Sequence, residues 1–239
     1  MGMLNIARRV VQAFGLDVTR YRPTTLQGYR RQLLLASRGV DRVLDVGANA
    51  GQYALELRRF GYCGSIVSVE PLPDAFQALK AHAARDPRWD AVQIAVGARD
   101  SSATIHVAAN SVSSSLLPML PTHADIAPES RYTGTQTVAV TTVDAIAAAY
   151  RRDAVRTFLK ADTQGFEGAV LDGAVGTLPT LVGLEVEMSL VPLYDGAPLF
   201  GELHERILAL GFTPYGIEPE FIDPVTGRTL QINAVYVRD

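Results

Sequence analysis

The chain has 239 residues, of which 48% are hydrophobic and 20% are charged, a composition typical of one large α/β domain with a substantial core. The net charge of −3 and the scattered arginine pairs at 30–31, 58–59 and 151–152, interpreted as solvated faces, argue against nucleic acid as a partner. Cys63 is the only cysteine, and no run reaches the roughly 18 apolar residues of a membrane span. We therefore expect a cytoplasmic protein without an intrachain disulfide.

Two helices are predicted in residues 1–40, which we assign to an N-terminal helical extension. Residues 3–14 form a short basic amphipathic helix. Such a helix either packs against the main domain or makes a peripheral contact with the inner face of an anionic membrane that carries a lipid-linked acceptor. Residues 24–37 form the second helix, which ends before Gly39.

Residues 41–239 alternate strands with helices, which predicts a single α/β domain. Strand–helix units in succession imply parallel strands with right-handed crossovers. We expect a mostly parallel central sheet with helices on both faces and one antiparallel strand at the far edge. The helices follow Gly51 and Pro73 and lie at 144–150 and 199–210. The strands are predicted at 43–46, 65–69, 92–97, 103–108, 137–142, 157–161, 181–186, 212–217 and 230–237.

Residues 110–134 are the least regular part of the sequence and are rich in Ser, Pro and Thr. Loops of this length inside a compact domain are usually functional or disordered. We interpret this segment as a lid over an acceptor site. A plain surface loop is the alternative, and it fits the composition nearly as well.

The turn after the strand at 43–46 has the geometry of a nucleotide pocket. Gly47 and Gly51 lack a Cβ, so the backbone can turn sharply and let a ligand approach its N–H groups at the positive end of the next helix. A dinucleotide turn has the pattern G-x-G-x-x-G, but Asn49 stands at the second glycine. The remaining pattern, D-x-G-x-x-x-G from Asp45, resembles the first motif of class I methyltransferases, which bind S-adenosylmethionine (SAM). Glu70, at the end of the next strand, suits ribose hydroxyls in either cofactor class.

Two carboxylates follow later strands. Asp162 follows the strand at 157–161 and Glu187 follows the strand at 181–186, and ligands of parallel sheets lie beyond such strand ends. Asp162 is the first candidate for a general base and Glu187 the second; alternatively, the two share a Mg²⁺ ion that lowers the pKa of an acceptor hydroxyl. Asp162 as a cap of the next helix is the structural alternative. His123, in the predicted lid, is a third candidate base.

Six motifs together are far more specific than the glycine turn. They are DVGANAGQYA at 45–54, SVEPLPDAF at 68–76, the loop with Asn110, Ser114 and Ser115, LKADTQGFE at 159–167, EMSLVPLYDG at 187–196 and QINAVYVR at 231–238. With these motifs, the chain resembles the FkbM-type SAM-dependent methyltransferases. It departs from that family at Ala161, where a larger aliphatic residue is common, and at Gln164, where Glu is frequent.

The resemblance implies a class I (Rossmann-like) SAM methyltransferase fold over residues 41–239 and O-methylation of hydroxyls, often on sugars. The expected acceptor is a small molecule or a lipid-linked glycan, and Mg²⁺ is not required. An NAD-dependent oxidoreductase, disfavoured by Asn49, and a non-catalytic SAM-binding module are the alternatives. The expected acceptor-binding residues are Asn110, Ser114, Ser115 and Tyr194. The expected cofactor-binding residues are Asp45, Gly47, Asn49, Gly51, Tyr53, Glu70, Pro71, Ala95 and Asp162.

Overall fold

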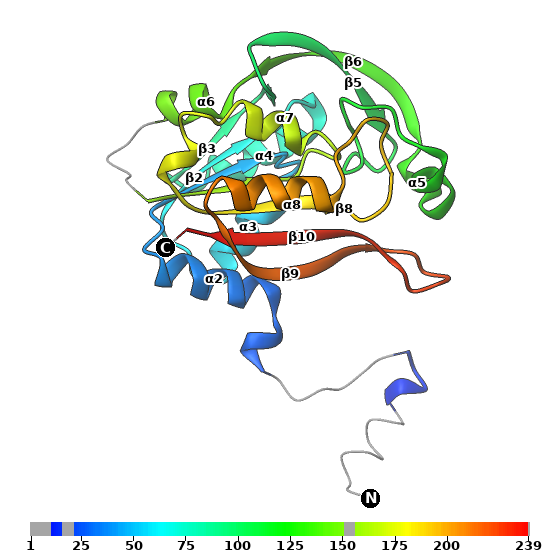
Figure 1. Cartoon of the computed structure of the whole chain (residues 1–239), viewed down its shortest axis with the longest axis horizontal. Coiled ribbons are helices and arrows are strands. Elements are labelled where there is room, and N and C mark those ends of the chain that lie inside the picture. The colour runs from blue at the N-terminus through cyan, green and yellow to red at the C-terminus, as the bar shows by residue number, and fades with distance from the viewer. Residues whose placement is uncertain (1–10, 16–21, 151–155, 239) are drawn as a thin grey trace, which may run out of the picture.

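The computed structural model describes residues 11–15, 22–150 and 156–238. A seven-stranded sheet forms the centre of the molecule, and a three-stranded sheet lies beyond one end of its strands (Figure 1). Most of the helix predicted at 3–14 lies outside the described residues. No helix in the described part of the chain is long and apolar enough to cross a bilayer.

The central sheet has the strand order β3-β2-β1-β7-β8-β10-β9. Strands β1, β2, β3, β7 and β8 are parallel, and β10 is antiparallel to both of its neighbours, β8 and β9. The predicted, mostly parallel class I fold is therefore confirmed, but the antiparallel strand β10 lies one position inside the edge that β9 forms. The chain proceeds outward from β1 to β3 and returns to the other side of β1 as β7, so the order reverses between β1 and β7, where open α/β sheets bind ligands. The bounds are β1 Arg42–Val46, β2 Ser65–Val69, β3 Trp89–Val92, β7 Thr157–Ala161, β8 Leu181–Ser189, β9 Thr213–Ile222 and β10 Thr229–Val237.

Helices cover both faces of the sheet because successive strand residues point to opposite sides. Val43 and Phe158 belong to a core cluster that contains residues of α2 (Gln27–Ser37), α3 (Gln52–Arg59) and α4 (Pro73–Ala83). Their neighbours Leu44 and Leu159 belong to a second cluster, with residues of α6 (Val143–Ala149), α7 (Glu167–Asp172) and α8 (Phe200–Ala209). Short 3₁₀ turns complete the helical set: η1 Pro23–Thr25, η2 Pro128–Ser130 and η3 Leu178–Thr180.

The smaller sheet differs from the sequence-based prediction. The strand predicted at 92–97 is divided: Val92 ends β3, while Ala95–Val96 forms β4 and pairs with β6 of the other sheet. The segment 110–134, predicted to be irregular, contains α5 (Pro121–Ile126), η2 and the start of β6 (Tyr132–Thr141). Most of the first half of β6 is exposed, so it lacks the alternating pattern that identifies a strand, although it pairs with β5 (Ser101–Ala108).

Gly47 sits where the chain leaves β1, with a positive φ of 75°. A Cβ at this position would lie 1.7 Å from the carbonyl oxygen of Asp162, so β1 and β7 approach closely only because the side chain is absent. The close approach places the two strand ends at one site.

Gly47→Ala is expected to destabilise the fold strongly. The left-handed backbone costs a residue with a side chain about 1–2 kcal/mol, and the clash adds about 1–3 kcal/mol. Urea denaturation measures the change in the free energy of unfolding. Gly134→Ala is the matched control, since a Cβ there has no neighbour within 4 Å; equal stability of the two variants would contradict the close approach.

Candidate functional site

A cavity of about 610 Å³ opens beyond the carboxyl ends of β1, β2, β7 and β8. Twelve residues expected from the sequence line it, and three do not: Asp45, Gly51 and Tyr194. Asp45 is fully buried, Gly51 faces Leu79 and Trp89, and Tyr194 is 1% exposed, so these three support the wall from behind. The lining residues among those expected are Gly47, Asn49, Tyr53, Glu70, Pro71, Ala95, Asn110, Ser114, Ser115, His123, Asp162 and Glu187.

The N–H groups of the glycine turn are all paired within the protein. Those of Gly47 and Ala48 donate to Val69 O, and that of Gly51 donates to Ala48 O. The N–H of Asn49 donates to Glu70 Oε2 at 2.9 Å, and that of Ala50 donates to Asn49 Oδ1 at 2.8 Å. The sequence predicted that these groups face the ligand. Instead, the five amides from 47 to 51 hold the turn closed, and none of them is left to bind a phosphate.

Glu70 joins the turn to the strand that follows it. Its Oε2 accepts the N–H of Asn49, and its Oε1 accepts the N–H of Leu72 at 2.8 Å. Burial raises the pKa of Glu70 to about 7, although both N–H donors favour the charged form. Each carboxylate oxygen retains a lone pair for a further donor, so the side chain can accept hydroxyl groups from the cavity.

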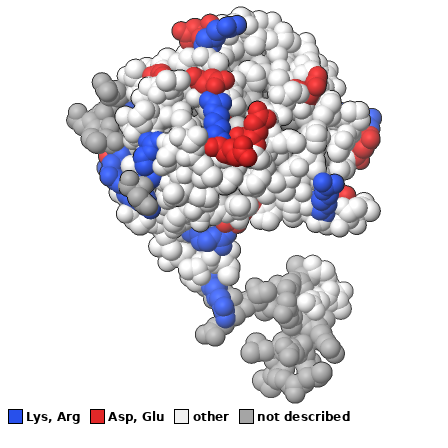
Figure 2. Space-filling model, viewed as in Figure 1, with Lys and Arg blue, Asp and Glu red and all other residues white. Residues whose placement is uncertain are grey.

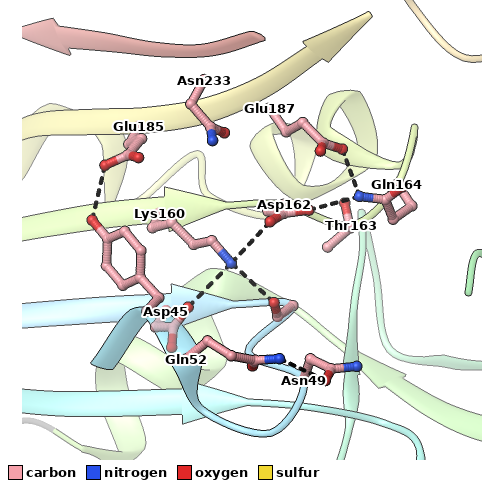
Figure 3. A network of polar contacts seen from close by, with 12 residues as sticks. Asp45, Asn49, Gln52, Lys160, Asp162, Thr163, Gln164, Glu185, Glu187 and Asn233 are labelled. Carbon is pink, nitrogen blue, oxygen red and sulfur yellow. Dashed lines mark hydrogen bonds and ion pairs between the residues drawn. The ribbon is translucent and has the colours of Figure 1, made fainter. Parts of the chain in front are cut away.

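Lys160 lies at the centre of the site, between the ends of β1 and β7 (Figure 3). Its Nζ donates to Gly47 O at 2.9 Å and lies 3.3 Å from Asp45 Oδ1 and 3.4 Å from Asp162 Oδ2. Burial alone would lower the pKa of Lys160, but the charges of Asp162 and Asp45 outweigh it and raise the pKa. The ammonium is therefore fixed as a cation that compensates two carboxylates.

A second buried ion pair connects α2 to the sheet. Arg31 makes two hydrogen bonds to Glu185, of 2.8 Å and 2.7 Å, and it also pairs with Glu56. The hydroxyl of Tyr53 donates to Glu185 at 2.9 Å, and the guanidinium lies 4.5 Å from the centre of that ring. Arg31 was predicted to lie on a solvated face; it is 8% exposed because these partners enclose it. Helix α2 thus contributes to the cavity wall.

Asp162 and Glu187 meet through the side chain of Gln164 (Figure 3). The Gln164 Nε2 donates to Asp162 Oδ1 at 3.0 Å and to Glu187 Oε2 at 2.8 Å. Burial, followed by the charge of Asp162, raises the pKa of Glu187 well above its ordinary value. Asp162 does not cap α7, whose N-cap residue is Phe166. The two candidate bases are therefore neighbours in different electrostatic environments.

Residues 110–127 form the wall opposite the sheet and are tied to it. Asn49 Nδ2 donates to Ser111 Oγ at 3.1 Å, and Ser115 Oγ donates to Gln164 O at 2.7 Å. Ser114 Oγ accepts the N–H of Ala108. Although the segment was predicted to be irregular, these bonds order it over the cavity; its role as a moving lid stays a prediction.

His123 lines the same wall with its ring between Tyr194 and Phe221. Burial lowers the pKa of His123 to about 4, so the imidazole is neutral at pH 7. Its Nδ1 has no hydrogen-bond partner among the described residues. Because that nitrogen is buried, His123 contributes to the wall by packing against the two aromatic rings.

Mg²⁺ was an alternative for Asp162 and Glu187. The amide of Gln164 bridges these carboxylates. In the part of the chain that the structure describes, no group of three or more His, Cys, Asp or Glu side chains is arranged to hold a metal. Mg²⁺ stays a prediction.

The profile of the "Methyltransferase FkbM domain" family matches residues 45–214, well over half of the chain. The chain belongs to this family. It is a methyltransferase, and the cavity combines the family's glycine turn with the carboxylates at the ends of β2, β7 and β8. No curated protein is similar enough to count as a match.

Solved methyltransferase structures resemble the chain only distantly. The O-methyltransferase TomG from Streptomyces achromogenes is 14% identical, with 99% of this chain and 89% of that chain covered and a TM-score of 0.49. A putative caffeoyl-CoA O-methyltransferase from Staphylococcus aureus is 9% identical (100% and 93% covered, TM-score 0.47). An rRNA methylase from Streptococcus thermophilus is 10% identical (92% and 99% covered, TM-score 0.47). At this distance they say nothing of the acceptor.

Sequence reasoning missed several residues of the site. Lys160 and Glu185 are charged residues inside buried, mostly apolar strands, and a charge at such a position is the signal that would have identified them. Arg31 gave no such signal, because its partners come from distant segments. The other missed lining residues include Gln27, Glu56, Gln164, Glu220, Phe221, Gln231 and Asn233.

Lys160→Met is expected to destabilise the methyltransferase by about 3–5 kcal/mol, since it leaves the carboxylate of Asp45 buried without its cation. Chemical denaturation measures the loss. Adding Asp45→Asn to Lys160→Met removes the uncompensated charge and should recover part of the stability. If the double variant is as unstable as the sum of both single variants, the ion pair is not the cause.

Proposed function

We propose that the protein is a SAM-dependent O-methyltransferase that methylates a hydroxyl group, with a sugar of a glycolipid or another glycosylated metabolite as the acceptor. The observation that carries the choice of cofactor is the closed glycine turn, whose five amides are already paired. A dinucleotide needs free amides at this turn for its pyrophosphate, whereas SAM has no phosphate.

The charge of the cavity supports the same choice. A negative wall favours the positive sulfonium of SAM and opposes the pyrophosphate of NAD. An NAD-dependent oxidoreductase is disfavoured by both observations. The described lining residues include seven carboxylates, Glu56, Glu70, Glu129, Asp162, Glu185, Glu187 and Glu220, against two cations, Arg31 and Lys160.

The residues around the turn fit the parts of SAM. Glu70 offers carboxylate oxygens to the ribose hydroxyls. Ala95, Leu72 and Ile94 provide an apolar wall for the adenine. When bound, SAM supplies an activated methyl group; the protein's task is to place an acceptor oxygen in line with it and to remove a proton.

We assign Asp162 as the general base that accepts this proton. The acceptor oxygen forms a bond to the methyl carbon as the carbon–sulfur bond breaks, and the electron pair of the broken bond stays on the sulfur. The hydroxyl proton passes to the carboxylate of Asp162, which lines the cavity and is 30% exposed. A positioned base of this kind accelerates transfer by roughly 10²- to 10⁴-fold.

The acceptor side combines the carboxyl groups of Asp162 and Glu187 with neutral polar side chains. Asn110, Ser115, Gln231 and Asn233 present amide and hydroxyl groups, and Phe221 adds a ring. Such a mixture suits a polyhydroxylated acceptor. Nucleic acid is not proposed: Figure 2 shows positive and negative side chains interspersed over the viewed face, without a large positive patch.

The direct test is mass spectrometry of glycolipids and small metabolites from cells with and without the protein. The proposal expects a species that is lighter by one methyl group in the cells that lack it. Purified protein and SAM with a deuterated methyl group should convert that species to its labelled form. If the protein binds SAM but transfers the methyl group to no compound in the extracts, a non-catalytic SAM-binding module would be favoured instead.

The affinity for SAM should depend on pH through Glu70. Ribose hydroxyls donate to the ionised carboxylate more strongly than to the neutral acid. Because the pKa of Glu70 in the free protein is about 7, affinity is full above pH 7 and falls below it, by up to about tenfold per pH unit. Calorimetry between pH 5.5 and about 8.5 measures the slope.

Glu70→Gln should flatten that slope. Glu167→Gln is the control: burial also raises the pKa of Glu167 to about 7, but this residue does not line the cavity. A slope that persists in Glu70→Gln, or disappears in Glu167→Gln, would remove Glu70 from the ribose site.

Asp162→Asn should leave the affinity for SAM nearly unchanged and lower the turnover of the identified acceptor by about two orders of magnitude or more, because the base is lost while a similar shape remains. Single-turnover kinetics at saturating SAM measures this step. Asp74→Asn, on the exposed first turn of α4, is the control. Near-normal turnover would exclude Asp162 as the base.

A further inference from the structure

Gln164 occupies the space between the two carboxylates of the acceptor side (Figure 3). Its Nε2 is within hydrogen-bonding distance of both Asp162 Oδ1 and Glu187 Oε2. The orientation of the amide is fixed from behind, because the buried hydroxyl of Tyr194 donates to Gln164 Oε1 at 2.7 Å. In this orientation the Gln164 nitrogen faces both carboxylates and bridges them.

Both hydrogen bonds to Glu187 end on the same carboxylate oxygen. Gln231 Nε2 donates to the same oxygen, Oε2, at 3.0 Å, so two donors converge on it. Glu187 Oε1 has no hydrogen-bond partner among the described residues, and the side chain lines the cavity. A proton on Glu187 therefore resides on Oε1, where it can be donated to a ligand. Burial and the charge of Asp162 raise the pKa of Glu187, which favours this protonated form.

Asp162 has the opposite environment. Lys160 Nζ lies 3.4 Å from its Oδ2, so a cation accompanies its charge, whereas the hydrogen-bond donors to Glu187 are neutral amides. The cation beside Asp162 favours a proton acceptor there, whereas the unpaired oxygen of Glu187 leaves room for a proton that can be donated. One is a proton acceptor and the other a proton donor, side by side.

We propose that Gln164 is a positioning residue that holds Asp162 and Glu187 as an unequal pair, and that this pair binds two adjacent hydroxyls of a 1,2-diol in the acceptor. Asp162 accepts the proton of the hydroxyl that is methylated. Glu187 Oε1–H donates to the oxygen of the neighbouring hydroxyl, which is bound but not consumed. The inference rests on the proposed O-methyl transfer and specifies its substrate class: the acceptor carries a free hydroxyl next to the one that is methylated.

The experiment uses two small probes, cis-1,2-cyclohexanediol and cyclohexanol, which differ by one hydroxyl. The full-length protein is first saturated with S-adenosylhomocysteine, so that the ribose site at Glu70 is filled. Saturation-transfer NMR then compares the two probes at equal concentration. The proposal expects a signal from the diol several times larger than that from cyclohexanol. A diol signal no larger than the cyclohexanol signal overturns it.

Gln164→Met tests the positioning role, because methionine fills a similar volume without an N–H donor. The preference for the diol should disappear in Gln164→Met while affinity for S-adenosylhomocysteine stays within about twofold, which shows that the donor side remains folded. Gln136→Met, at an exposed position of β6, should keep the preference. A preference that survives in Gln164→Met overturns the role of Gln164. Absence of S-adenosylhomocysteine binding in the unmodified protein would instead contradict the proposed function.

Discussion

The arrangement of this site depends on the buried ammonium of Lys160. Removing a cation and two carboxylates from water costs several kcal/mol per ion, and their mutual attraction repays this only when the geometry is close. Lys160 meets that condition with Asp45 on β1, Asp162 after β7 and the carbonyl of Gly47 in the turn. One side chain therefore fixes the relative positions of the donor turn and the candidate base. Gly47, without a Cβ, permits the close approach that Lys160 stabilises.

The closed turn follows from the same constraint. With Gly47 held by Lys160 and Asn49 held by Glu70, the backbone amides turn inward and pair with Val69, Glu70 and one another. In the proposed function, the pocket recognises its ligand through side-chain carboxylates, because the five amides of the turn are already paired. A cation with a ribose suits such a pocket, and a pyrophosphate does not. The departure from the dinucleotide pattern at Asn49 thus has a structural reason.

Much of the central sheet was predictable from sequence, because strands buried on both faces appear as short apolar runs. The strand at 157–161 was predicted with the bounds that β7 has. The errors arose where local pattern and tertiary pairing disagree. Residues 92–97 were predicted as one strand, but they contribute to two sheets. Val92 ends β3 of the central sheet, and Ala95–Val96 forms β4 of the smaller sheet. Arginine is usually a surface residue, but Arg31 is buried because Glu185 of β8 and Glu56 of α3 pair with it.

The donor half and the acceptor half of the site also differed in how far the sequence predicted them. Most of the polar groups of the donor half come from one continuous stretch, from Asp45 to Glu70, whose glycines and carboxylates are visible in sequence. The acceptor half is assembled around Gln164, which has a positive φ of 56°, a conformation that costs a residue with a side chain about 1–3 kcal/mol.

Contacts from separate segments maintain that conformation. Ser115 donates to the carbonyl of Gln164, and Tyr194 donates to its amide oxygen. A strained residue persists only when its surroundings over-determine it, and here the segments around 115 and 194 both do so. The wall over the cavity and the pair of carboxylates are therefore connected through Gln164. Ser115 contacts the backbone and Tyr194 the side chain of the residue that bridges Asp162 and Glu187, and no local pattern in the sequence reveals these contacts between distant segments.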